Sequence, residues 1–283
     1  MIILFAVLVV VIATFFMLCA FTADSISYGK YPMQVWNSAI LTEGDDVYSF
    51  DSGALRTVFK KKVPGQKLVG ATLVTDCNKK HRITPLYYMP GIELSHGFQV
   101  RRFFFNRVEF HAQASKTQKL KAGIIGMNII RKANWHFSFR DAFFETLPLN
   151  RQIAIPSDAM VLSYDNNKRP LTTLVIENQK YEDVLIDMGC DEDFCFNSLN
   201  LTHITNSIGP QQISESSRSG VFSSKKEIFY LFDSVHVLGK IYQNISIHES
   251  NYNLVGLGFL SRFDHLFWDS RHKKVYLWNE EEK

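Results

Sequence analysis

Cysteine and proline are scarce in this 283-residue sequence, which contains four cysteines and 8 prolines. Four cysteines are too few for a disulfide-rich scaffold, and none of their spacings matches a zinc site. Cys190 and Cys195 are close enough in sequence for a short-loop disulfide in an oxidising compartment. The nine histidines form no His-Glu-x-x-His pair, and no Gly-x-Ser-x-Gly elbow is present. We therefore expect no metal site, no cofactor and no serine-hydrolase chemistry.

Charge is absent from residues 2–23, "IILFAVLVVVIATFFMLCAFTA". As a helix rising about 1.5 Å per residue, this segment would span roughly 33 Å, enough to cross the hydrocarbon core of a bilayer. A signal peptide normally has basic residues before its apolar stretch and small residues at positions −1 and −3 of its cleavage site. Basic residues are absent here, and a cut after Ala20 or Ala23 would leave Leu18 or Phe21 at −3. We therefore expect residues 1–23 to form an uncleaved transmembrane anchor, with the rest of the chain periplasmic or extracellular. Secretion after cleavage is the alternative.

The net charge of +3 conceals an asymmetry between the two parts of the chain. Residues 24–148 contain 18 Lys and Arg against 10 Asp and Glu, and the remainder contains 13 against 18. The basic part could lie near an anionic membrane surface, which is a third and weaker possibility for function. The stretch "RRFFFNR" mixes basic and aromatic residues as single-strand nucleic-acid grooves do, but it lacks a second stacking platform. We expect no nucleic-acid partner.

Short β-type runs separated by polar turns dominate the region after the anchor. The chain has 23 Phe and 11 Tyr, and aromatic and β-branched residues favour strands. The runs predict strands of about five to eight residues at 33–40, 46–50, 68–74, 82–89, 98–105 and 107–114. The segments 126–133 and 258–263 each follow or begin at a glycine and predict short helices. The fold class is therefore mainly β.

An internal repeat divides the chain. The first half closes with "GIIGMNIIRKANWHFSF" and the second with "NLVGLGFLSRFDHLFWD", so that Gly126 corresponds to Gly256. Asp51 precedes Gly126 by 75 residues, and Asp187 precedes Gly256 by 69. The same features therefore recur in one order at nearly one spacing, and we expect the linker between the halves at 166–170, "NNKRP".

Each half places one aspartate at the end of an apolar strand, in "VYSFDSGA" and "VLIDMGC". The glycine two positions later permits a tight turn and a close approach of another chain segment. If the two turns face each other, their carboxyl groups share one proton and can activate a water for amide hydrolysis without a covalent intermediate. The alternatives are an ordinary turn at Asp51 and, at Asp187, a solvated acidic loop or a weak cation site.

These motifs resemble those of retropepsin-like and pepsin-like aspartic proteases. The elements "SFDSGA" and "LIDMGC" match the aspartate loops of that family, and "IIGMNII" and "LVGLGFL" match the segments that pack behind them. The resemblance runs from about residue 28 to 278. It implies a bilobal pepsin-like fold of two related β-barrel lobes, 24–150 and 151–283, preceded by an N-terminal transmembrane helix. It also implies an aspartic endopeptidase with a polypeptide substrate, and a monomer, because one chain supplies both halves.

The resemblance also assigns individual residues. Asp51 and Asp187 would form the catalytic dyad, and six residues would support their loops: Ser52, Gly53, Gly126, Met188, Gly189 and Gly256. A hairpin at 70–88 would be the flap that covers the substrate, and its tip would supply Asp76, Cys77, Asn78 and Lys79. Residues 214–231, rich in serine around Gly220, would be a mobile counterpart in the second lobe.

The chain departs from the family pattern at three positions beside the aspartates. The family has a hydroxyl residue after each aspartate, which bonds to the opposing loop, but the second loop has Met188. Two supporting Ser or Thr positions are occupied by Leu55 and Asp191. A catalytic group misplaced by about 1 Å can lose about a hundredfold in rate. The alternative function is therefore a weak or inactive pseudoprotease that binds peptides or acts as a scaffold at the membrane.

Overall fold

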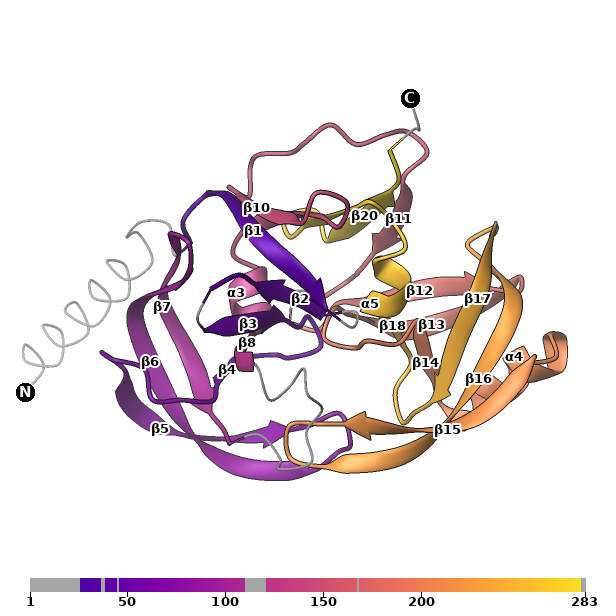
Figure 1. Cartoon of the computed structure of the whole chain (residues 1–283), viewed down its shortest axis with the longest axis horizontal. Helices are drawn as coiled ribbons and strands as arrows, with labels where there is room; N and C mark the ends of the chain where they lie inside the picture. The colour runs from indigo at the N-terminus through magenta and orange to yellow at the C-terminus, as the bar shows by residue number, and fades with distance from the viewer. Residues whose placement is uncertain (1–25, 37–38, 45, 110–120, 167, 281–283) are drawn as a thin grey trace, which may run out of the picture.

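The computed structural model describes residues 26–36, 39–44, 46–109, 121–166 and 168–280 (Figure 1). The described chain is mainly β, as predicted, and its strands form two sheets. The strands of the first half are β1 (Gly29–Trp36), β2 (Ala39–Thr42), β3 (Val47–Phe50), β4 (Thr57–Phe59), β5 (Lys67–Thr75), β6 (His81–Ser95), β7 (Phe98–Arg107), β8 (Lys121–Ile125), β9 (Asn134–Ser138) and β10 (Phe143–Leu147). Those of the second half are β11 (Met160–Ser163), β12 (Leu171–Ile176), β13 (Gln179–Asp187), β14 (Phe194–Phe196), β15 (Gln212–Ser219), β16 (Ser224–Val237), β17 (Lys240–Glu249), β18 (Leu254–Gly256), β19 (His265–Asp269) and β20 (Lys274–Trp278).

Strand pairing repeats between the halves. In the first half β3 runs parallel to β8, β8 antiparallel to β4, and β4 parallel to β7. In the second half β13, β18, β14 and β17 pair in the same senses and the same order. The larger sheet has the order β11-β20-β19-β9-β10-β1-β2-β3-β8-β4-β7-β6-β5, and the smaller has β12-β13-β18-β14-β17-β16-β15. The repeat in the sequence is therefore also a repeat of topology.

The two halves join through β9 and β19, which pair antiparallel. Trp135 lies opposite Trp268, and Ser138 lies opposite His265. Because His265 follows Trp135 by the same 130 residues that separate Gly256 from Gly126, exchanging the halves leaves this register unchanged. One continuous hydrophobic core, which includes the fully buried Trp135 and Trp268, extends across both halves. The aspartate loops are thus held on a shared, rigid core.

Two of the predicted strands differ from the structure. Residues 33–40 are not one strand, because β1 ends at Trp36, β2 begins at Ala39, and the two pair antiparallel. Asn37 and Ser38, which separate the two strands, are turn-forming residue types, so the signal for a break was in the sequence. The run at 107–114 supplies only the last residue of β7; Val108 and Glu109 follow it outside any strand, and 110–114 lie outside the described residues.

The helices are α3 (Met127–Ile130), α4 (Ser198–Ser207) and α5 (Leu257–Leu260). α3 and α5 lie where helices were predicted but are only four residues long. α4 was missed because its Asn, Thr and Ile content gives it low intrinsic helix propensity. It is stabilised instead by the Asn197 side chain, which accepts a hydrogen bond from the Asn200 N–H, and by burial of Leu201 and Ile204.

The predicted linker between the halves and the predicted membrane anchor are the two remaining expectations. The segment 166–170 connects β11 to β12, both in the second half, whereas residues 148–159 connect the last strand of the first half to β11. The predicted anchor at 2–23 lies outside the described residues. Among the helices that the structure describes, none is long and apolar enough to span a bilayer.

Gly126 and Gly256 occupy equivalent positions, each with φ of −96°, at the start of α3 and α5. A Cβ atom at residue 126 would lie 2.6 Å from the carbonyl carbon of Arg56, and one at residue 256 would overlap the carbonyl oxygen of Glu192. Arg56 and Glu192 follow the two aspartates at the same distance of five residues. Each glycine therefore lets its helix pack directly behind an aspartate loop.

We expect Gly256→Ala to destabilise the fold, because the added methyl group must push the backbone at residue 192 aside. Overpacking of this kind costs about 1–3 kcal/mol, and thermal unfolding followed by circular dichroism would measure it. Gly209→Ala is the matched control, since a Cβ there meets nothing within 4 Å and φ is not positive. Equal melting temperatures for the two variants would contradict the packing role assigned to Gly256.

Candidate active site

The two aspartates leave equivalent points of the two sheets. Asp51 follows β3 directly, and its N–H donates to the carbonyl of Ile125 at 3.0 Å. Asp187 is the last residue of β13 and lies opposite Gly256 on the parallel strand β18. β3 is buried along most of its length, and β13 is buried in the three apolar residues just before Asp187, so each carboxyl group stands where a buried strand segment ends.

The structure brings Asp51 and Asp187 together. A Cβ atom on Gly53, in the first loop, would lie 2.5 Å from Oδ2 of Asp187, and one on Gly189, in the second loop, would overlap the Asp51 carboxyl group. The Gly53 N–H donates to Oδ1 of Asp187 at 3.2 Å, and the Gly189 N–H donates to the same oxygen at 2.9 Å. The Ala54 N–H donates to Oδ1 of Asp51 at 2.8 Å. Each carboxyl group therefore fills the space that the glycine of the opposite loop leaves open.

The electrostatics of the pair favour one retained proton. Burial, and after it the neighbouring Asp51 carboxyl group, raise the pKa of Asp187 to about 7. The N–H groups of Gly189 and Gly53 oppose this shift without cancelling it. Because two adjacent carboxylates repel each other at short range, the arrangement suits a proton shared between them.

Ser52 links the two loops through a single hydroxyl group. Its buried Oγ donates to the carbonyl of Ile186 at 2.7 Å and accepts from the N–H of Met188 at 2.9 Å. The equivalent position in the second loop is Met188, which is fully buried in the hydrophobic core and has no hydroxyl to return these bonds. The loops are therefore connected by one hydroxyl bridge, and apolar packing takes the place of a second one.

Different side chains support the two loops from behind. In the first half, Thr57 donates its hydroxyl to Oδ1 of Asn128 at 2.9 Å and accepts from the Gly126 N–H at 3.2 Å. In the second half, Arg262 binds the buried Asp193 carboxylate through two nitrogens, at 2.9 and 3.0 Å. Leu55 and Asp191, at the positions where the family has hydroxyl residues, are both exposed.

Two hairpin tips meet across from the aspartate loops (Figure 1). The turn between β5 and β6 contains residues 76–80, the predicted flap tip. Asp76 accepts hydrogen bonds from Oγ of Ser223 at 2.7 Å and from the N–H of Phe222 at 3.2 Å, and Asn78 donates to Oγ of Ser223 at 3.1 Å. Cys77 and Lys79, from the same tip, are exposed. The second hairpin, expected to be mobile, is thus hydrogen-bonded to the first at its tip.

An ion network that includes Glu192 of the second aspartate loop was not predicted from the sequence. Nδ1 of His248 lies 2.8 Å from Glu227, Nε2 lies 2.5 Å from Glu192, and Arg218 lies 3.0 Å from Glu227. Burial lowers the pKa of His248, but the hydrogen bonds to Glu192 and Glu227 outweigh burial and raise it to about 9. The solvated-loop interpretation of "DMGCDED" is wrong for Glu192 and Asp193. Because the four residues are spread over 57 positions, no local motif could reveal the network.

The network contains the one group in the described residues that could hold a metal ion: Glu192, Glu227 and His248. Each imidazole nitrogen faces a carboxylate oxygen, which suits a doubly protonated imidazolium that donates from both nitrogens. Arg218 adds a second positive charge beside Glu227. These cations balance the two carboxylates, so the donor set fits an ion network better than a metal centre.

The sulfur atoms of Cys190 and Cys195 lie 3.9 Å apart and are not bonded to each other. The disulfide that their spacing in the sequence allows is therefore not formed in this structure. Nη2 of Arg218 donates to Sγ of Cys195 at 2.8 Å, which joins the thiol pair to the ion network.

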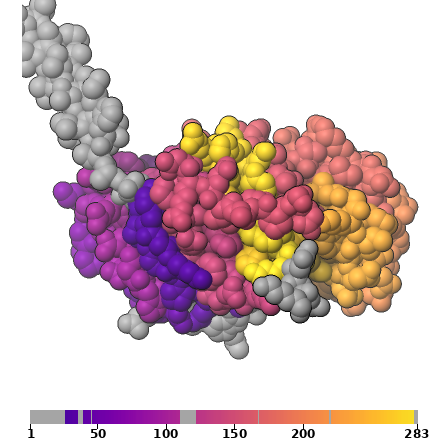
Figure 2. Space-filling view, turned by 90° about the horizontal axis from the view of Figure 1, so that it is seen from above, coloured from indigo at the N-terminus to yellow at the C-terminus, as the bar shows by residue number. Residues whose placement is uncertain are grey.

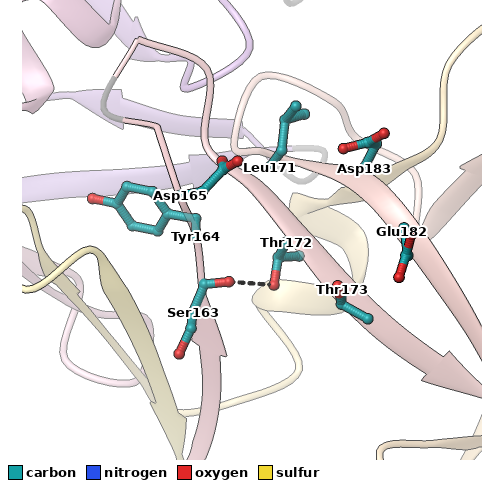
Figure 3. A pocket seen from close by; sticks show the side chains of 8 residues that line it. All are labelled: Ser163, Tyr164, Asp165, Leu171, Thr172, Thr173, Glu182 and Asp183. Atoms are coloured by element: carbon teal, nitrogen blue, oxygen red, sulfur yellow. Dashed lines mark hydrogen bonds between the residues drawn. The ribbon is translucent and has the colours of Figure 1, made fainter.

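A separate surface hollow of about 400 Å³ lies where β11, β12 and β13 adjoin (Figure 3). Its walls include the carboxyl groups of Asp165, Glu182 and Asp183, and at its base Thr172 donates its hydroxyl to the carbonyl of Ser163 at 2.7 Å. Neither Asp51 nor Asp187 lines it. In the space-filling view, residues near the C-terminus, in yellow, lie between the first half and the remainder of the second half (Figure 2).

We expect Asp187→Asn to stabilise the protein at pH 8 but not at pH 4. The folded-state pKa of Asp187, about 7, is above its unfolded value near 3.9, so stability is lost as pH rises from about 4 through 7. Asparagine removes this loss, and the gain at pH 8 should be on the order of 4 kcal/mol. Chemical denaturation at the two pH values measures it; a gain equal at both would contradict the raised pKa.

Comparisons with known proteins find similarity among solved structures but not among sequences. No family model matches the sequence, and no curated protein matches it. A solved structure of a retropepsin-like aspartic protease from Rickettsia conorii is similar to this chain, with 15% sequence identity and a TM-score of 0.31, over 45% of this chain and 95% of that one.

Proposed function

We propose that this chain is an aspartic endopeptidase whose Asp51 and Asp187 activate a water molecule to hydrolyse peptide bonds. The observation that carries the proposal is the meeting of the two loops, in which each carboxyl group occupies the space beside the glycine of the other loop. An ordinary turn aspartate would face solvent rather than a second carboxyl group. The repeated strand pairing supports two lobes of pepsin-like plan, 24–150 and 151–283. In this proposal one chain supplies both lobes and acts as a monomer, and residues 2–23 anchor it in the membrane.

The mechanism follows from one proton held between two carboxyl groups. The ionised carboxylate takes a proton from a bound water, while the protonated one donates a hydrogen bond to the carbonyl oxygen of the substrate. Each group then exchanges its role as the tetrahedral intermediate collapses and the amine leaves. The N–H groups of Gly53 and Gly189 fix Oδ1 of Asp187 in place, so little reorganisation is needed at the moment of reaction.

A polypeptide substrate would bind between the loops and the hairpin tips. In this proposal the tip residues Asp76, Cys77, Asn78 and Lys79 act as the flap over the carboxyl pair and would contact an extended substrate. The hydrogen bonds between this tip and the opposite hairpin support a closed arrangement.

Proteolysis assays on an unfolded protein substrate test the proposal. We expect Asp51→Asn and Asp187→Asn each to reduce kcat by about a thousandfold or more, because each removes one of two groups that transfer protons. Asp158→Asn is the matched control, since that side chain is exposed and lies in the 148–159 connection, outside both aspartate loops. Retained activity in either loop variant would refute the dyad.

The second candidate function, a weak or inactive pseudoprotease that binds peptides, is favoured by the buried Met188. A threonine there would place a hydroxyl opposite the Ser52 loop and supply the second bridge. We expect Met188→Thr to raise kcat and to lower the melting temperature, because a buried apolar side chain is lost at a cost of about 2 kcal/mol. Met188→Leu, which keeps an apolar side chain, is the control. If activity is unchanged in Met188→Thr, the missing hydroxyl does not limit catalysis.

A further inference from the structure

Cys190, in the second aspartate loop, and Cys195, on β14 after it, form a thiol pair that the first half lacks. The backbone of Cys190 matches that of Ala54: the Leu257 N–H donates to the carbonyl of Cys190 at 2.7 Å, and the Met127 N–H donates to that of Ala54 at 2.8 Å. The first loop therefore makes the same backbone contact without a sulfur atom at this position.

Cys195 has an equally clear counterpart. It pairs with Leu254 on β18 and with His248 on β17, as Val58 pairs with Ile124 on β8 and with Asn106 on β7. The same pairing is therefore made with valine in the first half. Because alanine and valine suffice in the first half, the fold does not require either thiol of the second half.

The surroundings of the pair divide the two thiols chemically. The guanidinium of Arg218 donates to Sγ of the fully buried Cys195 at 2.8 Å and stabilises negative charge on that sulfur. Cys190 is half-buried, and its pKa is raised well above the usual range, first by its hydrogen bond to Cys195 and then by burial. Arg218 therefore distinguishes the two: Cys195 is the sulfur beside the cation, and Cys190 is the thiol that keeps its proton.

We propose that Cys190 and Cys195 form a peroxide-reactive dithiol site whose oxidation to a disulfide lowers the activity of the aspartate pair. The effect on activity rests on the proposed protease function; the formation of the disulfide does not. The sulfur atoms are 3.9 Å apart, and the Arg218 guanidinium contacts one of them. Cys190 lies in the loop, three residues after Asp187, and Cys195 lies on β14, which follows the loop.

The oxidation uses hydrogen peroxide, which is small enough to reach a buried sulfur, as the oxidant. The Cys195 sulfur attacks one peroxide oxygen, the O–O bond breaks, and a sulfenic acid forms while the departing hydroxide takes the Cys195 proton and leaves as water. The Cys190 sulfur then attacks the Cys195 sulfur, the S–O bond breaks, and the departing hydroxide takes the Cys190 proton. Two thiols and one peroxide thus give one disulfide and two waters.

Closing the disulfide must move the loop. The two sulfur atoms would approach from 3.9 Å to about 2.05 Å. The N–H of Cys190 donates to the carbonyl of Asp187 at 3.3 Å, and the Leu257 N–H donates to the carbonyl of Cys190, so the movement is transmitted to the backbone that carries the carboxyl group. Because a shift of about 1 Å can cost about a hundredfold in rate, we expect oxidation to lower kcat/KM by at least about tenfold.

The full-length protein, purified in detergent and treated with hydrogen peroxide, tests disulfide formation directly. Cys190 and Cys195 fall within one tryptic peptide, after Lys180 and ending at Arg218, that contains no other cysteine. We expect this peptide to lose 2 Da and to resist alkylation when no reductant is added. The exposed Cys77, alkylated in the same sample, is the control for the alkylation reaction. Alkylation of both thiols after peroxide treatment would overturn the proposal. A mass gain of 16 Da instead would assign the oxidation to Met188 or to a sulfenic acid.

Activity measured on the same samples tests the consequence. We expect peroxide to lower kcat/KM and dithiothreitol to restore it. In Cys190→Ala and Cys195→Val, which carry the residues of the first half, peroxide should no longer lower activity. A disulfide that forms without loss of activity, or a loss that persists in both variants, would overturn the regulatory role. If the reduced protein has no activity at all, the protease function fails, while the peptide mass still decides whether the dithiol site exists.

Discussion

The structure depends on the contact between two short loops that each carry an aspartate. Gly53 and Gly189 leave no side chain where the opposite carboxyl group lies, so the two loops can approach closely. Ser52 then fixes their separation by bonding to both Ile186 and Met188 of the other loop. Two carboxyl groups forced into one space would repel each other if both were ionised, and a retained proton relieves that repulsion. Close packing of the backbone therefore determines the protonation of the site.

That contact is possible only because the two halves share one core. The β9–β19 pairing joins them with a register that is unchanged when the halves are exchanged, and the core continues through Trp135 and Trp268. Gly126 and Gly256 place a helix behind each aspartate loop in the same backbone conformation. Displacement of one loop would have to deform this common core, which resists changes in packing. The carboxyl pair is consequently held by elements from both ends of the sequence.

The two halves have kept one backbone plan and changed its polar contacts. Asn106 and His248 occupy corresponding positions beside β4 and β14. Asn106 donates to the neutral hydroxyls of Thr72 and Thr84 at 2.9 Å, whereas His248 lies between two carboxylates. The first network is neutral apart from Arg56, and the second is built from ions that must balance one another. Charge-balanced networks tolerate loss of one member poorly, so the second loop is the more sensitive of the two.

The repeat of strands, the glycine motifs and the mainly β fold could be predicted because they are written in local patterns. The end of β1 at Trp36 was signalled by the polar residues that follow it, but the apolar residues on either side favour one continuous strand. α4 could not be predicted, since a cap at Asn197 and burial of Leu201 decide it against weak propensity. The ion network could not be predicted either. Its residues come from a loop and three strands, and only the folded sheet brings Glu192 and Arg218 within reach of the others.

The meeting of the hairpin tips sets a requirement for access to the carboxyl pair. Asp76 is almost fully buried, and its carboxylate accepts bonds from Phe222 and Ser223 of the opposite tip. Hydrogen bonds to a charged group are worth about 1.5–3 kcal/mol each, so the closed arrangement is favoured until something replaces them. An extended polypeptide can do so, because its backbone offers N–H donors at regular spacing along its length. Entry of a chain between the tips and formation of new contacts with Asp76 would therefore be one event, and the same carboxylate that closes the site could hold a substrate within it.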